Sequence, residues 1–177
     1  MNPIKHFKTI TYHKYLVMQG CFKVGLYVQG ITHDLSKYLP AEFFVGAKYF
    51  QGNRSPNNAE REDKGYSSAW LHHKGRNKHH YEYWIDYSMK DIEGGMQPAP
   101  MPVRYVVEMF MDRVAASKVY NKEKYRDSDP LAYYRKGKNQ NLLHPKTRRQ
   151  LELLLEMLAQ RGEEETYAYI KNRILKK

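Results

Sequence analysis

Apolar side chains recur at helical spacing along most of the chain, which predicts a succession of α-helices. In the first 50 residues such runs cover 12–21, 24–31 and 43–50, and glycines break them apart. The run at 103–120 carries apolar side chains on nearly every face, which is typical of a helix through the middle of a domain. No stretch alternates between apolar and polar residues over a useful length. The sequence therefore predicts an all-α fold.

Two further helices are expected at about 145–175. A stripe of four leucines, at positions 151, 154, 155 and 158, ends at Gly162, a residue suited to a helix C-terminus. The last helix, 163–175, begins with three glutamates and is followed by two lysines, which matches the helix dipole at both ends. The leucine stripe could serve the core or a homodimer interface equally well.

Two polar segments interrupt the helical pattern. Residues 51–66 contain two glycines, a proline and three asparagines, and we expect an exposed loop there. Residues 94–102 contain three prolines, which stop any helix that precedes them. The chain has 177 residues, 41% of them apolar, enough for one compact domain and too few for two of ordinary size. We expect a single domain over 1–177.

Composition narrows the classes of protein that the chain can belong to. Basic residues outnumber acidic ones by 30 to 19, and the formal charge of +11 favours an anionic partner. The single cysteine, Cys21, excludes a disulfide framework and any zinc site of several thiolates, and it is expected in the core. The N-terminus lacks a signal peptide's apolar segment, and no run reaches the ~18 apolar residues of a membrane span. We expect a soluble cytoplasmic protein without a membrane partner.

Five of the eight histidines gather in two short clusters. The clusters are His33 with Asp34, and His72, His73, His79 and His80. Imidazole and carboxylate groups suit divalent transition metals such as Mn, Fe, Zn, Ni or Co, and adjacent His and Asp residues can reach one ion. An isolated His-Asp pair is more often a surface dipeptide or a hydrogen-bonded core pair. The clustering, rather than the pair, points to a metal.

Asp112 stands out because it lies within the apolar run at 103–120. Burying an unpaired carboxylate costs on the order of several kcal/mol, so Asp112 must either pair with a cationic side chain or ligate a cation. Arg104 and Arg113 are its candidate partners in an ion pair. The clustered histidines offer the other explanation, a metal ion.

Two motifs carry a resemblance to a known superfamily. ITHDLSK at 31–37 is similar to the His-Asp-x-x-Lys motif, and MDRVAAS at 111–117 to the closing Asp-Arg segment, of the HD-domain superfamily of metal-dependent phosphohydrolases. The tandem His79-His80 resembles the binuclear branches, including the HD-GYP phosphodiesterases, although the Gly-Tyr-Pro element is absent. HDLSKYLPAEF with HKGRNKHHYEYW is also similar to an uncharacterised family of bacterial and phage proteins of about this length.

The resemblance implies a compact HD-domain-like helical bundle over about 10–120, with additional C-terminal helices. It also implies one or two divalent transition metal ions. The first ion would be held by His13, His33, Asp34 and Asp112, and the second by His73, His79 and His80. His72 competes with His73, and the His-x-x-x-Asn-x-His-His pattern favours His73. His13 requires a chain reversal between Gly20 and Gly25, because one unbroken helix would place it about 30 Å from His33.

The resemblance further implies an enzyme that hydrolyses a nucleotide or another phosphorylated small molecule with metal-activated water. Asp34 and Lys37 would be its catalytic residues. Lys37 would meet a phosphate oxygen, unless it is simply an exposed helix lysine. Glu42 would support a ligand or cap the next helix, and Asn77 would orient a ligand or, preferably, cap the helix after it.

Basic and aromatic residues accompany the second histidine cluster. Lys74, Arg76 and Lys78 would form a rim that attracts phosphate, while Tyr81, Tyr83, Trp84 and Tyr87 would stack on a base or fill the core. His6 and His144 are expected to be solvated or capping residues. Two alternatives to the phosphohydrolase are a basic helical protein that binds nucleic acid and an HD-like di-iron oxygenase.

Overall fold

The computed structural model describes residues 1–137 and 142–176. Within these ranges the chain forms α1 (Pro3–Lys23), α2 (Tyr27–Thr32), α3 (Pro40–Lys48), α4 (Pro56–Lys64), α5 (Ser68–Lys74), α6 (Val103–Asn121), α7 (Asp129–Gly137) and α8 (Pro145–Tyr169), with short strands β1 (Ile85–Tyr87) and β2 (Met96–Pro98). Short helical turns lie at Leu35–Tyr38, Tyr81–Trp84, Glu93–Gly95, Lys122–Lys124 and Ile170–Ile174. The predicted all-α fold class is confirmed.

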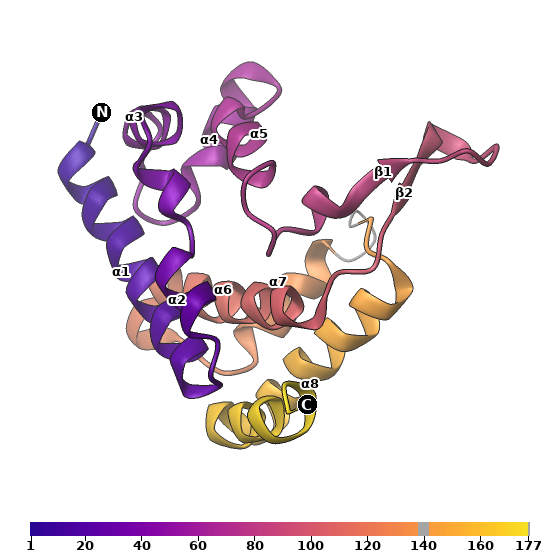
Figure 1. Cartoon of the computed structure of the whole chain (residues 1–177). Helices are drawn as coiled ribbons and strands as arrows, with labels where there is room; N and C mark the ends of the chain where they lie inside the picture. Colours follow the sequence, from indigo (N-terminus) through magenta and orange to yellow (C-terminus); the bar gives the residue numbers. More distant parts are fainter. Residues whose placement is uncertain (138–141, 177) are drawn as a thin grey trace.

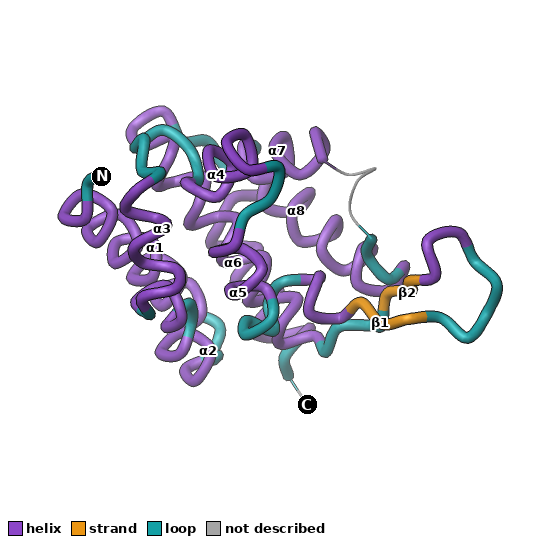
Figure 2. Tube along the Cα trace, turned by 90° about the horizontal axis from the view of Figure 1, so that it is seen from above, coloured by secondary structure: helices purple, strands orange, loops and turns teal. Residues whose placement is uncertain are grey.

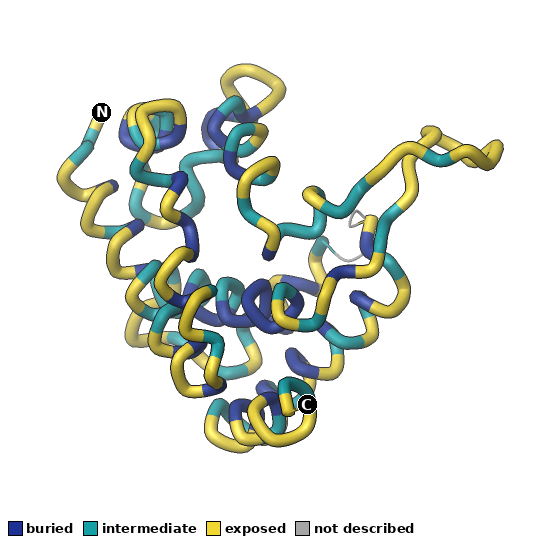
Figure 3. The backbone as a smooth tube through the Cα atoms, in the orientation of Figure 1, coloured by how far each residue is buried: buried dark blue, intermediate teal, exposed yellow. Residues whose placement is uncertain are grey.

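Helix α6 is the centre of the molecule. Figure 1 shows it crossing the middle, with α1 and α2 on one side and α8 on the other. Its residues 106–111 are all buried, and Figure 3 shows this buried stretch in the middle of the fold. The apolar side chains on nearly every face of 103–120 are explained by this position, because neighbouring helices cover α6 from several sides.

The hydrophobic core lies mainly between α6, α8 and the C-terminal half of α1. Val17, Cys21, Val106 and Phe110 are fully buried, as are three leucines of the α8 stripe, Leu151, Leu155 and Leu158. The stripe therefore faces the core. Because the same cluster of buried residues continues to Ile170, α7 and α8 share one core with the N-terminal helices.

The chain reverses direction directly after α1. Gly25 adopts a φ of +86°, which residues with a side chain rarely adopt, so the turn at this position suits glycine. Helix α2 then returns along α1 and brings the His33 ring to within 5.6 Å of the His13 ring. The reversal that the sequence required between Gly20 and Gly25 is thus present. Gly20 itself stays helical and lies against Met111, whose sulfur would be only 2.8 Å from a Cβ there.

Two local features differ from the sequence-based expectation. Residues 56–64 of the expected loop form α4, which starts at Pro56 and ends at Gly65 in the left-handed conformation. An antiparallel hairpin of β1 and β2 projects from the bundle (Figure 2). Strands of three residues are too short to give an alternating pattern, and a helix of polar residues gives no apolar stripe, so neither feature has a periodic signal.

The C-terminal helix breaks where the sequence indicated. Gly162 has non-helical angles, φ 79° and ψ 178°, and it kinks the segment Pro145–Tyr169 into two parts. None of the helices described is long and apolar enough to cross a membrane.

A buried acid in α4 fixes the start of α5, the helix that carries His73. The Glu60 carboxylate is fully buried and accepts hydrogen bonds from the hydroxyls of Ser67 (2.7 Å) and Ser68 (2.6 Å). Lys64 lies 3.1 Å from the same carboxylate. Burial alone raises the pKa of Glu60, but the hydrogen bonds from Ser68 and Ser67 outweigh it and lower the pKa to about 2. The acid in the unexpected helix α4 thus caps its neighbour.

Replacing this acid tests its contribution. We expect Glu60→Gln to lower the free energy of unfolding by about 1–3 kcal/mol near neutral pH, because buried donors lose a charged acceptor. The pKa of a glutamate carboxyl is ordinarily 4.5, and that of Glu60 is about 2. The wild type therefore has its full gain in free energy of unfolding over the variant above pH 4.5, and this gain is lost as the pH falls towards 2. Urea unfolding at several pH values measures the difference. Glu123→Gln, at an exposed position after α6, is the control; equal stability of the two variants would contradict the prediction.

Candidate metal centre

His33 and Asp34 lie in the turn that follows α2, and both side chains are almost completely buried. Asp34 adopts a left-handed backbone conformation, with a φ of 55°, which is uncommon for a residue other than glycine. Such a conformation is retained where the surrounding structure holds it, often at functional sites. Here this backbone conformation occurs where two consecutive side chains, those of His33 and Asp34, both lie close to the other clustered histidines.

The first group of close donor atoms joins α1, this turn and α6. It consists of His13, His33, Asp34 and Asp112, whose donor atoms lie within 4.8 Å of one another. His13 Nε2 is 2.9 Å from Asp112 Oδ1, and His33 Nε2 is 3.3 Å from Asp34 Oδ2. Neither Arg104 nor Arg113 pairs with Asp112. The buried acid of α6 therefore faces imidazoles instead of guanidinium groups.

The second group adds α5 and the segment after it. It consists of Asp34, His73, His79 and His80, again within 4.8 Å. His73 Nε2 and His79 Nε2 lie 3.2 and 3.4 Å from Asp34 Oδ1. Asp34 belongs to both groups, with Oδ2 towards His33 of the first and Oδ1 towards the second. The seven residues that the sequence singled out as ligands are thus brought together.

Several donor atoms in these groups are buried without a hydrogen-bond partner of good geometry. They are Nε2 of His33, His73, His79 and His80, together with Oδ1 of Asp34. Buried polar atoms are nearly always satisfied in folded proteins. Unsatisfied nitrogen and carboxylate oxygen atoms that converge on one region are the donor set of a transition metal site. These clusters could hold a metal ion.

Two buried glutamates orient the imidazoles from behind. Glu108 Oε1 lies 2.9 Å from His33 Nδ1 and 3.1 Å from His79 Nδ1, and Glu42 Oε2 lies 2.7 Å from His73 Nδ1. An Nδ1–H that donates to a carboxylate leaves the Nε2 lone pair free to ligate. Glu42 thus contacts His73, and its role in supporting a ligand stays a prediction. Sequence reasoning missed Glu108, although it precedes Asp112 by four residues and so lies on the same face of α6.

The contacts of α5 show which of its two adjacent histidines, His72 or His73, belongs to the second group. His72 Nδ1 lies 2.6 Å from Glu42 Oε1, and its side chain is 21% exposed, so it stays outside both groups. His73 is the inward residue, as the sequence pattern favoured. Asn77 does not cap a following helix; its amide donates to the His73 carbonyl and the Ser36 hydroxyl, both at 2.8 Å. It thus closes the end of α5.

Lys37 provides the positive charge nearest to the shared carboxylate. Its Nζ is 2.6 Å from Asp34 Oδ2, and its side chain is 28% exposed. Burial raises the pKa of Asp34, but His33 and Lys37 outweigh this effect and hold that pKa well below its usual range. Burial likewise opposes the charged form of Lys37, yet Asp34 and Asp112 raise its pKa above the usual value. Lys37 is therefore a cation held at the site.

The two remaining histidines, His6 and His144, lie in different environments. His6 was expected to be solvated, but it is 6% exposed and packs against Phe43, Phe50 and Gly46, because α1 starts already at Pro3. Burial and then the charge of Lys37 lower the pKa of His6 to about 4. His144 behaves as expected: its ring accepts a hydrogen bond from the backbone N–H of Lys146 at the start of α8.

A cleft of about 820 Å³ opens beside the two groups. The basic residues in its lining are Lys37, Arg54, Arg61, Arg113 and Lys136. Lys74, Arg76 and Lys78 are not among the residues that line this cleft, whereas His73 and His80 of the same segment are. The rim that attracts phosphate stays a prediction. Tyr81 lines the cleft, whereas Tyr83, Trp84 and Tyr87 do not.

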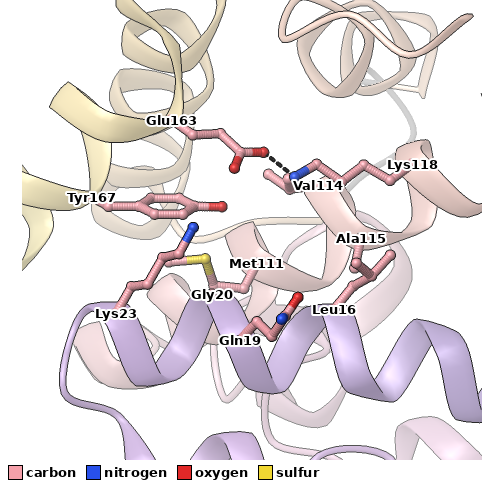
Figure 4. A pocket seen from close by; sticks show the side chains of 10 residues that line it. All are labelled: Leu16, Gln19, Gly20, Lys23, Met111, Val114, Ala115, Lys118, Glu163 and Tyr167. Atoms are coloured by element: carbon pink, nitrogen blue, oxygen red, sulfur yellow. Dashed lines mark ion pairs between the residues drawn. The ribbon is translucent and has the colours of Figure 1, made fainter. Parts of the chain in front are cut away.

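A second, much smaller pocket lies between α1, α6 and α8, away from the two groups (Figure 4). It measures about 40 Å³, room for a few water molecules. Lys118 and Glu163 form an ion pair at its edge, and Lys23 lies over the Tyr167 ring. The large cleft, not this pocket, has the size of a ligand site.

Fold and site together define an all-α protein with overlapping buried histidine–carboxylate groups. Two of them share Asp34, and a third consists of His33, His79 and Glu108. The chain belongs to the family described as a family of unknown function (DUF5662), whose model matches residues 2–157. The match includes every residue of both groups. No curated protein and no solved structure matches the chain.

The role of Glu108 can be tested through metal affinity. We expect Glu108→Met to weaken metal binding about 10- to 100-fold, because His33 and His79 lose the acceptor that orients them. Glu108→Gln should lie in between, since an amide oxygen still accepts one hydrogen bond. Titration of the metal-stripped protein with manganese or zinc measures the affinity, and Glu164→Met, on an exposed part of α8, is the control. Unchanged affinity in a folded Glu108→Met protein would refute this role.

Proposed function

We propose that this protein is a metal-dependent phosphohydrolase with an HD-domain-like centre of two divalent ions. The observation that carries the proposal is the position of Asp34, which turns one carboxylate oxygen towards each histidine group. A carboxylate shared by two groups of buried, unpartnered imidazole nitrogens suits a pair of ions better than a single one. The His-Asp-x-x-Lys resemblance at 33–37 supports the same conclusion.

The donor set fits the proposed ions. Nitrogen and oxygen donors without thiolate suit Mn, Fe, Zn, Ni or Co. A bound pair of such ions supplies an activated water and neutralises charge on the attacking and leaving oxygens of a phosphoryl group. In the first group the donors would be His13, His33, Asp34 and Asp112, and in the second Asp34, His73, His79 and His80.

The chain's own residues account for substrate binding. Lys37 lines the cleft and is partly exposed, so its ammonium group can reach a phosphate oxygen while remaining beside Asp34. Arg61 and Arg113 add positive charge to the same cleft. A concave site of this volume suits a small molecule. We therefore propose a nucleotide or another phosphorylated small molecule as substrate.

Metal content tests the centre directly. We expect about two transition metal ions per chain in the purified wild type. A variant should lose one ion if the replaced residue belongs to one group, and both ions if it belongs to both groups. Asp34→Ala should lose both ions, whereas Asp112→Ala and His80→Ala should each retain about one. His144→Ala is the matched control, because that histidine caps α8 far from the centre in sequence and should leave the content unchanged. Elemental analysis of the four variants measures the stoichiometry.

A wild type without stoichiometric metal, together with variants of unchanged content, would remove the basis of the proposal. A phosphatase screen with added manganese follows for the wild type. Iron in the protein, with oxygen uptake and no phosphatase activity, would instead favour the di-iron oxygenase, since a shared carboxylate between histidine groups also suits two irons. Affinity for nucleic acid that falls steeply with salt, in a metal-free protein, would favour the nucleic-acid binder.

Lys37 is expected to act on the substrate rather than on the ions. Lys37→Gln should lower kcat by about 10²- to 10³-fold, because a preorganised charge on the phosphoryl group is lost, while metal content stays the same. Lys8→Gln, on the exposed face of α1, is the control. Steady-state kinetics and elemental analysis on the same preparations decide the matter. A parallel loss of metal and activity would assign Lys37 a structural role instead.

A further inference from the structure

The cleft continues beyond the metal centre along a wall that contains Glu82 and Arg113. Glu82 lies two residues after His80 of the second group, and Arg113 directly follows Asp112 of the first. Both residues line the cleft. His80 and Asp112 line the same cleft, so the wall and both groups border one continuous space. A ligand with one end at the centre therefore reaches it.

Each of these side chains has a buried atom without a hydrogen-bond partner. The atoms are Glu82 Oε2, an acceptor, and Arg113 Nε, a donor. The guanidinium of Arg113 lies over the Tyr134 ring, 5.5 Å from its centroid, which helps to hold it in place. Glu82 and Arg113 form no ion pair with each other, so both atoms stay unsatisfied. The wall thus offers one acceptor and one donor.

The chemistry of the two atoms restricts the ligand. A second phosphate would satisfy Arg113 but would be repelled by the Glu82 carboxylate. An apolar group would leave both atoms unsatisfied. A nucleobase edge carries a donor beside an acceptor, so it pairs with a carboxylate oxygen and an arginine N–H together. The volume of the cleft, about 820 Å³, also accommodates a whole nucleotide.

We propose that Glu82 and Arg113 bind the base of a nucleotide whose phosphate lies at the metal centre. This inference rests on the proposed function, because it places the phosphate at the same centre. It narrows the substrate class from phosphorylated small molecules to nucleotides. The two residues act in binding and specificity, and they take no part in holding the ions.

Calorimetric titration of the full-length protein as purified tests the base subsite by comparing ligands with and without a base. The probes are the 5′-monophosphates of guanosine, adenosine, cytidine and uridine, with ribose 5-phosphate as the ligand without a base. We expect at least one nucleotide to bind about tenfold or more tightly than ribose 5-phosphate, a preference typical of paired contacts to a base edge. Equal affinity for all five probes, or binding of none of them, would overturn the inference.

Variants assign the preference to the two side chains. Glu82→Gln and Arg113→Gln should each reduce the ratio of nucleotide to ribose 5-phosphate affinity by about tenfold or change which base is preferred, and Arg113→Lys should do so while keeping the charge. Glu123→Gln and Arg149→Gln, both at exposed positions, are the controls. Circular dichroism and the metal content verify that each variant is folded. An unchanged ratio in folded variants would overturn the assignment.

The two proposals fail in distinguishable ways. A protein that prefers a nucleotide over ribose 5-phosphate but hydrolyses no phosphate ester supports the base subsite and contradicts the phosphohydrolase. A protein that hydrolyses phosphate esters without any preference for a base supports the phosphohydrolase and overturns the base subsite.

Discussion

The buried carboxylate of Asp34 is the constraint on which the rest of the structure depends. An acid at this depth is stable only with compensating charge or ligation, and four histidines and Lys37 surround it. Those residues come from α1, from the turn after α2 and from the segment 73–79. The reversal at Gly25 and the cap that Glu60 places on α5 therefore both act on the same carboxylate, one by returning the chain and the other by fixing His73.

The polar centre and the hydrophobic core share one helix. One part of α6 presents Glu108 and Asp112, one turn apart, to the histidines, while Val106 and Phe110 lie in the core. The leucine stripe of α8 belongs to that same core. A cluster of acids and imidazoles contributes little net hydrophobic stabilisation, so the helix that presents it needs an apolar face packed elsewhere. This explains why the C-terminal third of the chain carries few candidate ligands and many leucines.

The sequence predicted which residues cluster better than it predicted the surroundings of that cluster, and the reason is physical. His33, Asp34 and Asp112 are recognisable because their chemistry and order are unusual in apolar segments. Glu108 is equally buried, but an acid four residues from another resembles an ordinary helix face unless both are known to point inward. The residues that line the cleft were hard to predict for the same reason, since Lys74, Arg76 and Lys78 are not among them. Alternate residues of an irregular segment face opposite ways, and only the fold shows which of them turn inward.

The cleft borders only part of each of the two groups. His13 and Asp112 of the first group and His73 and His80 of the second line the cleft, whereas His33, His79 and Glu108 do not. Glu108 contacts Nδ1 of both rear imidazoles, His33 and His79, so the side of the groups away from the cleft is closed by this carboxylate. A ligand that enters the cleft therefore meets residues of both groups from the same side, with Lys37 in the same lining.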